Sequence, residues 1–173
     1  MHMTICQALP TAILRHDLVR CIANLLLQFE CVIWAGDLNY RINAPRKVAD
    51  LLLEKNYHEV LLANEQLTLA RKETSAFEGF SEGPLHFRPT YKFDHGCDTY
   101  DSGPKQRVPS WTDRVLYSGD FLCLKAYNSV SSLRSSDHRP VYANFEVQVD
   151  VSDHEEATLV ATNKTTSEVC AIS

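Results

Sequence analysis

The sequence predicts a layered α/β fold, because apolar strands alternate with amphipathic helices and a run of strands follows near the C-terminal end. Residues 14–29 carry apolar side chains at three- and four-residue steps, which is the pattern of one helix face packed on a core. Residues 31–34 then form a short apolar run that favours a buried strand. Later strands are expected over residues 114–117, 121–127 and 140–149.

Two more helices and a long loop are expected between these strands. A proline begins the segment 45–55, in which apolar residues recur at helical spacing, so we expect a helix there. Asn64 is a good N-cap for another helix, which is expected to end near Lys72. Residues 73–110 are rich in Gly, Pro, Ser and Asp, which is typical of a long functional loop, here with one short strand over residues 86–93.

The composition limits the possible classes of function. With 17 Lys and Arg against 22 Asp and Glu, the formal net charge is -5, which excludes the overall basic balance of a non-specific nucleic-acid-binding protein. Any site for an anion must therefore be a local basic patch. The six cysteines are scattered, so we expect reduced thiols in a cytosol-facing protein rather than a disulfide framework.

Asp37 and Asn39 follow the first predicted strand and are two residues apart. If extended geometry persists, both side chains point to the same face of the sheet. A carboxylate beside a carboxamide can orient a water molecule and bind a phosphate oxygen. An Asx-turn that closes the strand explains the same residues equally well, so both interpretations stand at this point.

Two further polar pairs lie just before later strands. These are Asp113 with Arg114, and Asp137 with His138. Taken alone, each pair is better explained by an ordinary structure, a surface ion pair in the first case and a loop histidine in the second. Active sites are usually assembled where strand ends meet at one edge of a sheet, so the three polar groups together indicate a catalytic site.

Two long motifs carry a resemblance to a known family. Residues 34–42 read WAGDLNYRI and residues 109–116 read PSWTDRVL, with FRPTYKFD at 87–94 and SDHRPV at 136–141. The sequence resembles the inositol polyphosphate 5-phosphatases, which belong to the superfamily of DNase I-like nucleases and phosphatases. It is most similar to their type IV (pharbin) branch, and the resemblance covers residues 31–149.

The resemblance implies a role for each matching residue. Asp37 matches the general base that orients the attacking water, and Asn39 matches the amide that binds the scissile phosphate. His138 matches the histidine that stabilises the charge developing on that phosphate, and Asp113 matches the carboxylate that orients this histidine. Asp137 is expected to face the metal, and the implied cofactor is Mg²⁺, which acts as a Lewis acid.

A second group of matching residues is expected to bind the substrate. Tyr91, Lys92, Lys105 and Arg107 match the residues that grip the neighbouring 4-phosphate, and charge-assisted hydrogen bonds to phosphate are strong. Arg114 is expected either to support this site or to pair with an acidic neighbour.

The expected function is Mg²⁺-dependent hydrolysis of the 5-phosphate of PI(4,5)P2 or PI(3,4,5)P3. One alternative is a non-catalytic phosphoinositide-binding protein that keeps the grip on the lipid. A nuclease of the same superfamily is a weaker alternative, because residues 87–94 and the acidic balance of the chain argue against it.

The resemblance also implies the C-terminal half of a DNase I-like two-sheet α/β sandwich, with a mixed or antiparallel sheet and flanking helices. The chain is expected to supply roughly one of the two sheets. The expected divisions are a divergent N-terminal segment with an amphipathic helix (1–30), a partial catalytic domain (31–149) and a disordered acidic tail (150–173). The Gln-Glu motif that supplies the main metal ligand of the family is absent, so weak or no activity is expected of the chain as it stands.

The sequence ends in Cys170-Ala-Ile-Ser173, which fits the CaaX motif for farnesylation of Cys170. A prenyl group tethers a protein to a membrane surface, here beside its lipid substrate, and makes a prenyl-binding carrier a further expected partner. The acidic tail supplies no polybasic second signal, so this association is expected to be reversible. The expected location is the cytoplasm with peripheral membrane association, at the Golgi or cilium by family resemblance. No nucleic-acid partner is expected.

Overall fold

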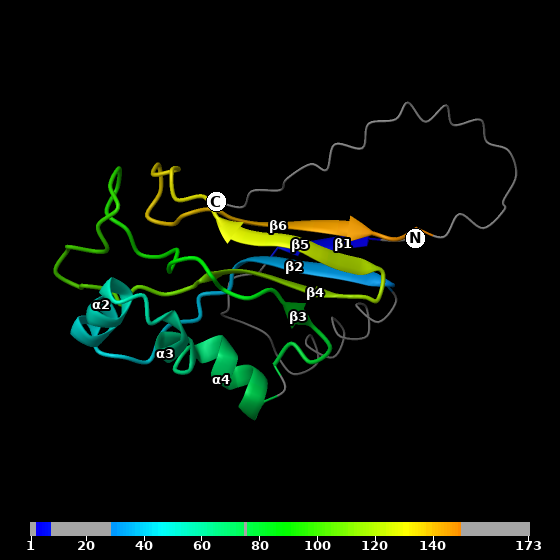
Figure 1. The fold of residues 1–173 in the computed structure, drawn as a ribbon, viewed down its shortest axis with the longest axis horizontal. Helices are drawn as coiled ribbons and strands as arrows, with labels where there is room; N and C mark the ends of the chain where they lie inside the picture. Colours follow the sequence, from blue (N-terminus) through cyan, green and yellow to red (C-terminus); the bar gives the residue numbers. More distant parts are fainter. Residues whose placement is uncertain (1–2, 8–28, 75, 150–173) are drawn as a thin grey trace, which may run out of the picture.

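The computed structural model describes residues 29–74 and 76–149 in full, and residues 3–7 by their backbone. Figure 1 shows strands stacked as layers, with short helices to one side of them. The helices are α2 (Arg46–Glu54), α3 (His58–Leu62) and α4 (Gln66–Glu73). The strands are β1 (Met3–Gln7), β2 (Cys31–Asp37), β3 (Ser81–Glu82), β4 (Asp113–Ser118), β5 (Leu122–Ser129) and β6 (Val141–Val147).

The strands form a 4-stranded sheet of order β1-β2-β4-β3 and a 2-stranded sheet of β5 and β6. β1 runs parallel to β2, whereas β4 is antiparallel to both β2 and β3, so the larger sheet is mixed. This confirms the predicted α/β fold with two sheets. The expectation that the chain supplies roughly one sheet is wrong, because the β5–β6 hairpin folds back as a second layer (Figure 1).

The main core lies between the two layers and continues under the helices. Ala35 of β2 and Val115 of β4 share a buried cluster with Val141 of β6, against which Tyr127 of β5 also packs. Removing a side chain of valine size from water contributes about 1.5–3 kcal/mol, so this contact holds the hairpin on the larger sheet. Trp111 is fully buried in the same cluster, where its indole N–H donates to the Phe87 carbonyl at 2.9 Å.

Helix α2 confirms the helix predicted over residues 45–55. It begins after Pro45, which has extended geometry and lacks the N–H that an N-terminal turn leaves unpaired. Ala49 and Leu53, four residues apart, are its buried side chains, whereas Val48 and Leu51 face outward. The face of α2 that packs on the core is therefore the one that carries Ala49 and Leu53, and not the one that carries Val48 and Leu51.

The N-cap of α4 is Glu65, not the predicted Asn64. The Glu65 carboxylate accepts hydrogen bonds from the backbone N–H groups of Leu67 at 2.9 Å and Thr68 at 2.8 Å. The Asn64 side chain instead donates to the carbonyl of Val60, at the end of α3. Helix α3 has 5 residues, which is too few to show a helical period in the sequence.

The strand predicted over residues 86–93 is wrong. In that segment only isolated bridges occur, between Tyr91 and Ser110, between Tyr91 and His138, and between Phe93 and Tyr100. Pro89 supplies no backbone N–H for a continuous ladder, which explains why apolar alternation there does not produce a strand. The predicted strands over 114–117, 121–127 and 140–149 correspond to β4, β5 and β6.

Some predicted features fall outside the described residues. These are most of the helix expected over residues 14–29 and the acidic tail with Cys170. β1 lies inside the segment expected to be divergent and was not predicted as a strand. In the part of the chain that the structure describes, no helix is long and apolar enough to cross a membrane.

A buried ionic network fixes the start of β4. The Arg114 side chain is 2% exposed, and its Nε and Nη2 donate to the two Glu82 oxygens at 2.6 and 2.7 Å. Its Nη1 lies 3.2 Å from Oε1 of Glu65, the cap of α4. The Tyr127 hydroxyl donates to Glu82 at 3.2 Å. One guanidinium therefore joins α4, β3 and β4, and through Tyr127 the second sheet.

Replacing Arg114 should destabilise the fold strongly. Arg114→Met leaves two buried carboxylates without their cation, and we expect the free energy of unfolding to fall by about 3–5 kcal/mol. Urea denaturation followed by circular dichroism measures this. The control is Lys125→Met, which removes an ion pair with Glu146 that is exposed on both sides and should leave the urea midpoint unchanged. A wild-type midpoint for Arg114→Met would contradict the structural role of the network.

Candidate functional site

The candidate site begins where β2 ends and β4 starts. The two strands are antiparallel, and their register places Asp37 opposite Asp113. One residue further on, the Leu38 N–H donates to the carbonyl of Thr112 at 2.8 Å, which continues the pairing past the strand ends. Two predicted site residues, 76 positions apart in the sequence (113 minus 37), are therefore neighbours at one end of the sheet.

Asp113 holds His138, as predicted. Nδ1 of His138 lies 3.1 and 3.0 Å from the two Asp113 oxygens. The hydroxyls of Thr90 and Thr112 also donate to Asp113, at 2.6 and 2.9 Å. Because the Asp113 carboxylate can only accept hydrogen bonds, Nδ1 of His138 carries the hydrogen of this contact. Nε2 of the same ring is left to bind another group. Neither threonine was predicted as a site residue, although each lies within one of the family motifs.

The surroundings of His138 favour its charged form. Burial lowers the pKa of His138, but the hydrogen bond and charge of Asp113 raise it, and the charges of Asp37 and Asp137 add to that rise. The net result is a pKa above the ordinary value for histidine. A protonated imidazole is suited to bind and stabilise a phosphate oxygen that gains negative charge.

Asp37 and Asn39 form the Asx-turn that was one of the two interpretations of this pair. The backbone N–H of Asn39 donates to Oδ1 of Asp37 at 2.8 Å, and Asn39 has a positive φ of 59°. The Asn39 side-chain oxygen accepts a hydrogen bond from the guanidinium of Arg41. Both side chains are therefore held in place, and the second Asp37 oxygen and the Asn39 amide nitrogen remain available to a ligand.

Tyr91 connects this group to the basic loop beside it. Its ring centroid lies 4.6 Å from that of His138, and the guanidinium carbon of Arg41 lies 4.2 Å from the same tyrosine ring. The backbone around Tyr91 bridges to His138 on one side and to Ser110 on the other. Tyr91 thus fixes the spacing between the histidine and the loop that carries the predicted phosphate-binding cations.

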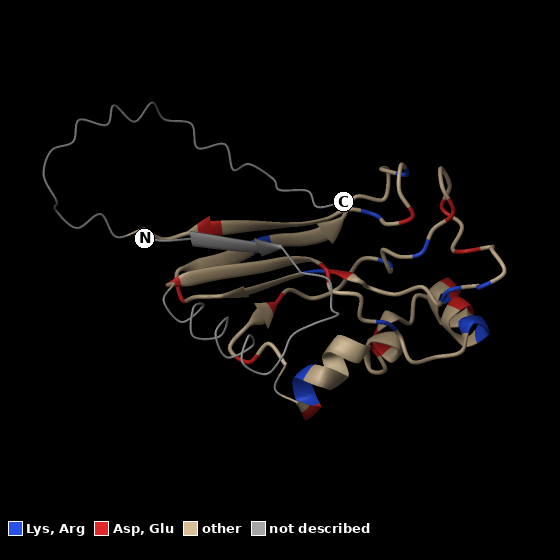
Figure 2. Ribbon diagram, turned by 180° about the vertical axis from the view of Figure 1, so that it is seen from behind, with Lys and Arg blue, Asp and Glu red and all other residues tan. Residues whose placement is uncertain are grey.

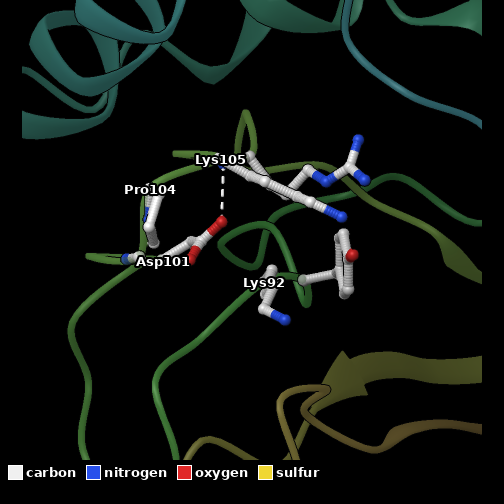
Figure 3. A pocket seen from close by; sticks show the side chains of 7 residues that line it. Lys92, Asp101, Pro104 and Lys105 are labelled. Carbon is white, nitrogen blue, oxygen red and sulfur yellow. Dashed lines mark hydrogen bonds between the residues drawn. The ribbon is translucent and has the colours of Figure 1, made fainter.

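The four residues predicted to grip a phosphate line one pocket (Figure 3). The pocket has a volume of about 430 Å³. Its lining consists of Tyr91, Lys92, Asp101, Gly103, Pro104, Lys105 and Arg107. Figure 3 shows Lys92 and Lys105 on different sides of the pocket, with the Asp101 carboxylate at its wall. Three cations around one hollow form a site for an anion with several negative charges.

The wider charge distribution agrees with the position of this pocket. The chain as a whole is acidic, and Figure 2 shows blue stretches of Lys and Arg among red stretches of Asp and Glu in the loops on the side of the molecule that holds α2. The local basic patch that the composition required is the pocket itself, where three cations stand against the single carboxylate of Asp101. An excess of positive charge raises the local concentration of an anionic ligand.

Asp137, predicted to face a metal ion, pairs with a cation instead. Its Oδ2 lies 3.3 Å from Nζ of Lys92. Burial raises the pKa of Asp137, but the Lys92 hydrogen bond and the charges of His138 and Lys92 lower it by more. Within residues 29–74 and 76–149, no three His, Cys, Asp or Glu side chains lie close enough together to hold a metal ion. Because Mg²⁺ in phosphate sites is usually held by one or two carboxylates together with water and substrate phosphates, a cluster of three such side chains is not required for it.

Arg114 does not join the pocket. Its guanidinium is buried against Glu65 and Glu82, so the second expectation for this residue, pairing with acidic neighbours, describes it. These acidic partners come from distant segments of the chain, so the motif around Arg114 alone cannot show that its charge is already engaged.

Asp113→Asn should lower the pKa of His138, because it removes the hydrogen-bonded charge that raises it. In the wild type, the charged imidazole contributes its full stability below the ordinary histidine pKa of about 6.5. That contribution is lost as the pH rises through the raised value. NMR titration of the imidazole signals measures the shift. Asp120→Asn, at an exposed turn, is the control. An unchanged His138 pKa in Asp113→Asn would contradict the pairing.

Comparisons with known proteins identify the relatives of this chain. The polyphosphatidylinositol phosphatase INP53 of Saccharomyces cerevisiae is 47% identical over 136 residues, which is 77% of this chain and 12% of the yeast protein. The phosphatidylinositol polyphosphate 5-phosphatase type IV of Homo sapiens is 46% identical over 134 residues, which is 73% of this chain and 21% of the human protein. The chain therefore spans about an eighth to a fifth of the length of these relatives.

Solved structures give the same fold with two different functions. The inositol polyphosphate 5-phosphatase domain of SPsynaptojanin, in complex with inositol (1,4)-bisphosphate and a calcium ion, matches with a TM-score of 0.68 and 42% identity, over 70% of this chain and 36% of that domain. Cimex nitrophorin, in a ferrous NO complex, matches with a TM-score of 0.63 and 39% identity, over 69% of this chain and 42% of that protein. The model of Endonuclease/Exonuclease/phosphatase family 2 matches residues 5–144, and the chain belongs to this family.

Proposed function

We propose that this chain takes part in hydrolysis of the 5-phosphate of phosphoinositides such as PI(4,5)P2 and PI(3,4,5)P3. The observation that carries the proposal is the position of the Asp113–His138 pair beside a pocket lined by Lys92, Lys105 and Arg107. A histidine held in its charged form suits a scissile phosphate, and an adjacent cationic pocket suits a second phosphate on the same ring. Two relatives that match most of this chain support the same substrate class, since one is named as a polyphosphatidylinositol phosphatase and the other as a phosphatidylinositol polyphosphate 5-phosphatase.

Each residue of the site has a distinct task in this proposal. Asp37 orients the attacking water with the carboxylate oxygen that the Asx-turn leaves free and accepts its proton. The Asn39 amide nitrogen donates to a phosphate oxygen, because Arg41 already engages the amide oxygen. The imidazolium of His138 neutralises charge that develops on the phosphate, and Asp113 fixes the orientation of the ring and stabilises its positive charge.

A divalent cation, Mg²⁺, is part of the same proposal. The SPsynaptojanin structure contains a calcium ion, which supports a metal-dependent reaction. The steps assigned above are carried by side chains of this chain, and the bound cation would supply a Lewis acid beside them. Addition of Mg²⁺ or EDTA to the assay below tests the requirement.

A second candidate function is phosphoinositide binding without hydrolysis. The pocket lined by Lys92, Lys105 and Arg107 favours it, since these cations can bind a multiply charged anion without hydrolysing it. The same fold also occurs in Cimex nitrophorin, whose structure was solved as a ferrous NO complex. The fold alone therefore does not separate the two functions, and the chemistry of the site must be tested.

The test measures phosphate release and ligand binding on the same protein. Because the Gln-Glu motif is absent, we expect only weak release of phosphate from short-chain PI(4,5)P2 in the presence of Mg²⁺. His138→Gln should lower this release by a further factor of about 10² or more, which is typical when a group that stabilises the transition state is removed. Calorimetry with inositol (1,4)-bisphosphate reports binding separately. His95→Gln, at an exposed position, is the matched control and should behave as the wild type.

Each outcome of this assay separates the candidates. Binding of the inositol phosphate without phosphate release supports the binding-only function. Absence of both contradicts the proposed function. Phosphate release that is equal in wild type and His138→Gln shows that the assigned site is not responsible. Cleavage of a DNA or RNA oligonucleotide in place of the lipid supports the nuclease alternative.

We also propose peripheral membrane association in the cytoplasm through a prenyl group on Cys170, which acts only if Ser173 is the last residue of the natural chain. In eukaryotic cells, intact-mass spectrometry should show the mass of a farnesyl group. Cys170→Ser should abolish this mass increase and move the protein from the membrane fraction to the soluble fraction. An unmodified mass for the wild type contradicts the proposal.

A further inference from the structure

We propose that Arg46 is a positioning residue for the phosphate pocket, which it serves by holding the loop that presents Lys105 and Arg107. This inference rests on the proposed function, because it concerns how the same site distinguishes a ligand with two neighbouring phosphates from one with a single phosphate. Arg46 itself does not line the pocket.

Arg46 reaches from the first turn of α2 to the backbone behind the pocket. Its Nη1 donates to the carbonyls of Asp101 at 2.9 Å and Arg107 at 3.1 Å, and its Nη2 donates to the carbonyl of Tyr100 at 3.1 Å. Its Nε pairs with Asp50 of the same helix at 2.8 Å. One side chain thus connects the two ends of the segment 101–107 and fixes that segment to α2.

Asp101 holds the same segment from within. Its Oδ2 accepts the N–H of Arg107 at 2.7 Å, and its Oδ1 accepts the N–H of Gly103 at 3.1 Å. The hydrogen bond from Arg107 is the main cause of a lowered pKa of Asp101, and the charges of Lys92 and Arg46 lower it further. Arg107 is therefore held at its N–H by Asp101 and at its carbonyl by Arg46.

The segment between these contacts has an unfavourable backbone. Gln106 has a positive φ of 41°, and its N–H donates to the Gly103 carbonyl at 3.0 Å in a tight turn. A non-glycine residue in this region costs about 1–3 kcal/mol and persists only when its surroundings fix it. Lys105 precedes this residue and Arg107 follows it, so the direction of both cationic side chains depends on the turn.

A guanidinium suits this position and an ammonium does not. The planar group of Arg46 directs its donors to three backbone carbonyls while Nε keeps its contact with Asp50. A lysine at this position keeps the charge near the pocket but places all its donors on one nitrogen at the end of a shorter side chain. Arg46→Lys therefore tests the effect of the loop conformation on binding while the positive charge near the pocket is kept.

The experiment compares two ligands by calorimetry, inositol 4,5-bisphosphate and inositol 5-phosphate. The wild type should prefer the bisphosphate, because the pocket holds its additional phosphate. Arg46→Lys should weaken that preference about tenfold, which corresponds to the loss of one charge-assisted hydrogen bond, and should leave the affinity for the monophosphate unchanged. Asp50→Asn removes only the contact within α2, so it is the matched control and should retain the preference.

Hydrogen exchange gives an independent measurement of the loop. The Arg107 amide should exchange faster in Arg46→Lys than in the wild type or Asp50→Asn. Wild-type preference together with wild-type exchange in Arg46→Lys overturns the inference and leaves the proposed function intact. Equal affinity of the wild type for the two ligands counts against the proposed phosphate pocket itself. Loss of affinity for both ligands in Arg46→Lys also overturns the inference, because it indicates general damage to the fold.

Discussion

The antiparallel register of β2 on β4 is the constraint on which the rest of the site depends. It places Asp37 opposite Asp113, and Asp113 then fixes the ring of His138. A shift of one residue would turn either carboxylate to the other face of the sheet. The register is held by the residues that follow Asp113 on β4, through the core around Val115 and the ionic network of Arg114. Packing and buried charge thus hold the carboxylates in place.

Sequence reasoning located the site better than it described the fold around it. Asp37, Asp113 and His138 lie in motifs at strand ends, and the structure brings them together because those ends meet at one edge. The pocket residues were also found, since lysines and an arginine stand out in an acidic chain. What sequence could not show are partners supplied from a distance: the acids that bury Arg114, and Lys92 beside Asp137. The cap of α4 was missed for a related reason, because Glu65 is favoured there by its second role with Arg114.

Membership of the family and activity within it are separate questions for this chain. The same fold is found in a 5-phosphatase domain and in a nitrophorin. The described residues bring together a carboxylate-held imidazole and a pocket lined by three cations. In the proposed function, these are the parts that bind a phosphorylated ligand, and the phosphate-release assay decides whether hydrolysis follows.

Tyr91 joins the two halves of the site more closely than their sequence separation suggests. Its neighbours bond directly to the histidine loop, with the Phe93 N–H donating to Asp137 and the Arg139 N–H to Thr90, each at 2.9 Å. Its own side chain lines the pocket. Tyr91 is thus the side chain in contact with both the histidine and the pocket. If a bound anion changes the proton affinity of His138, thermodynamic linkage requires protonation of His138 to change the affinity for that anion by the same factor.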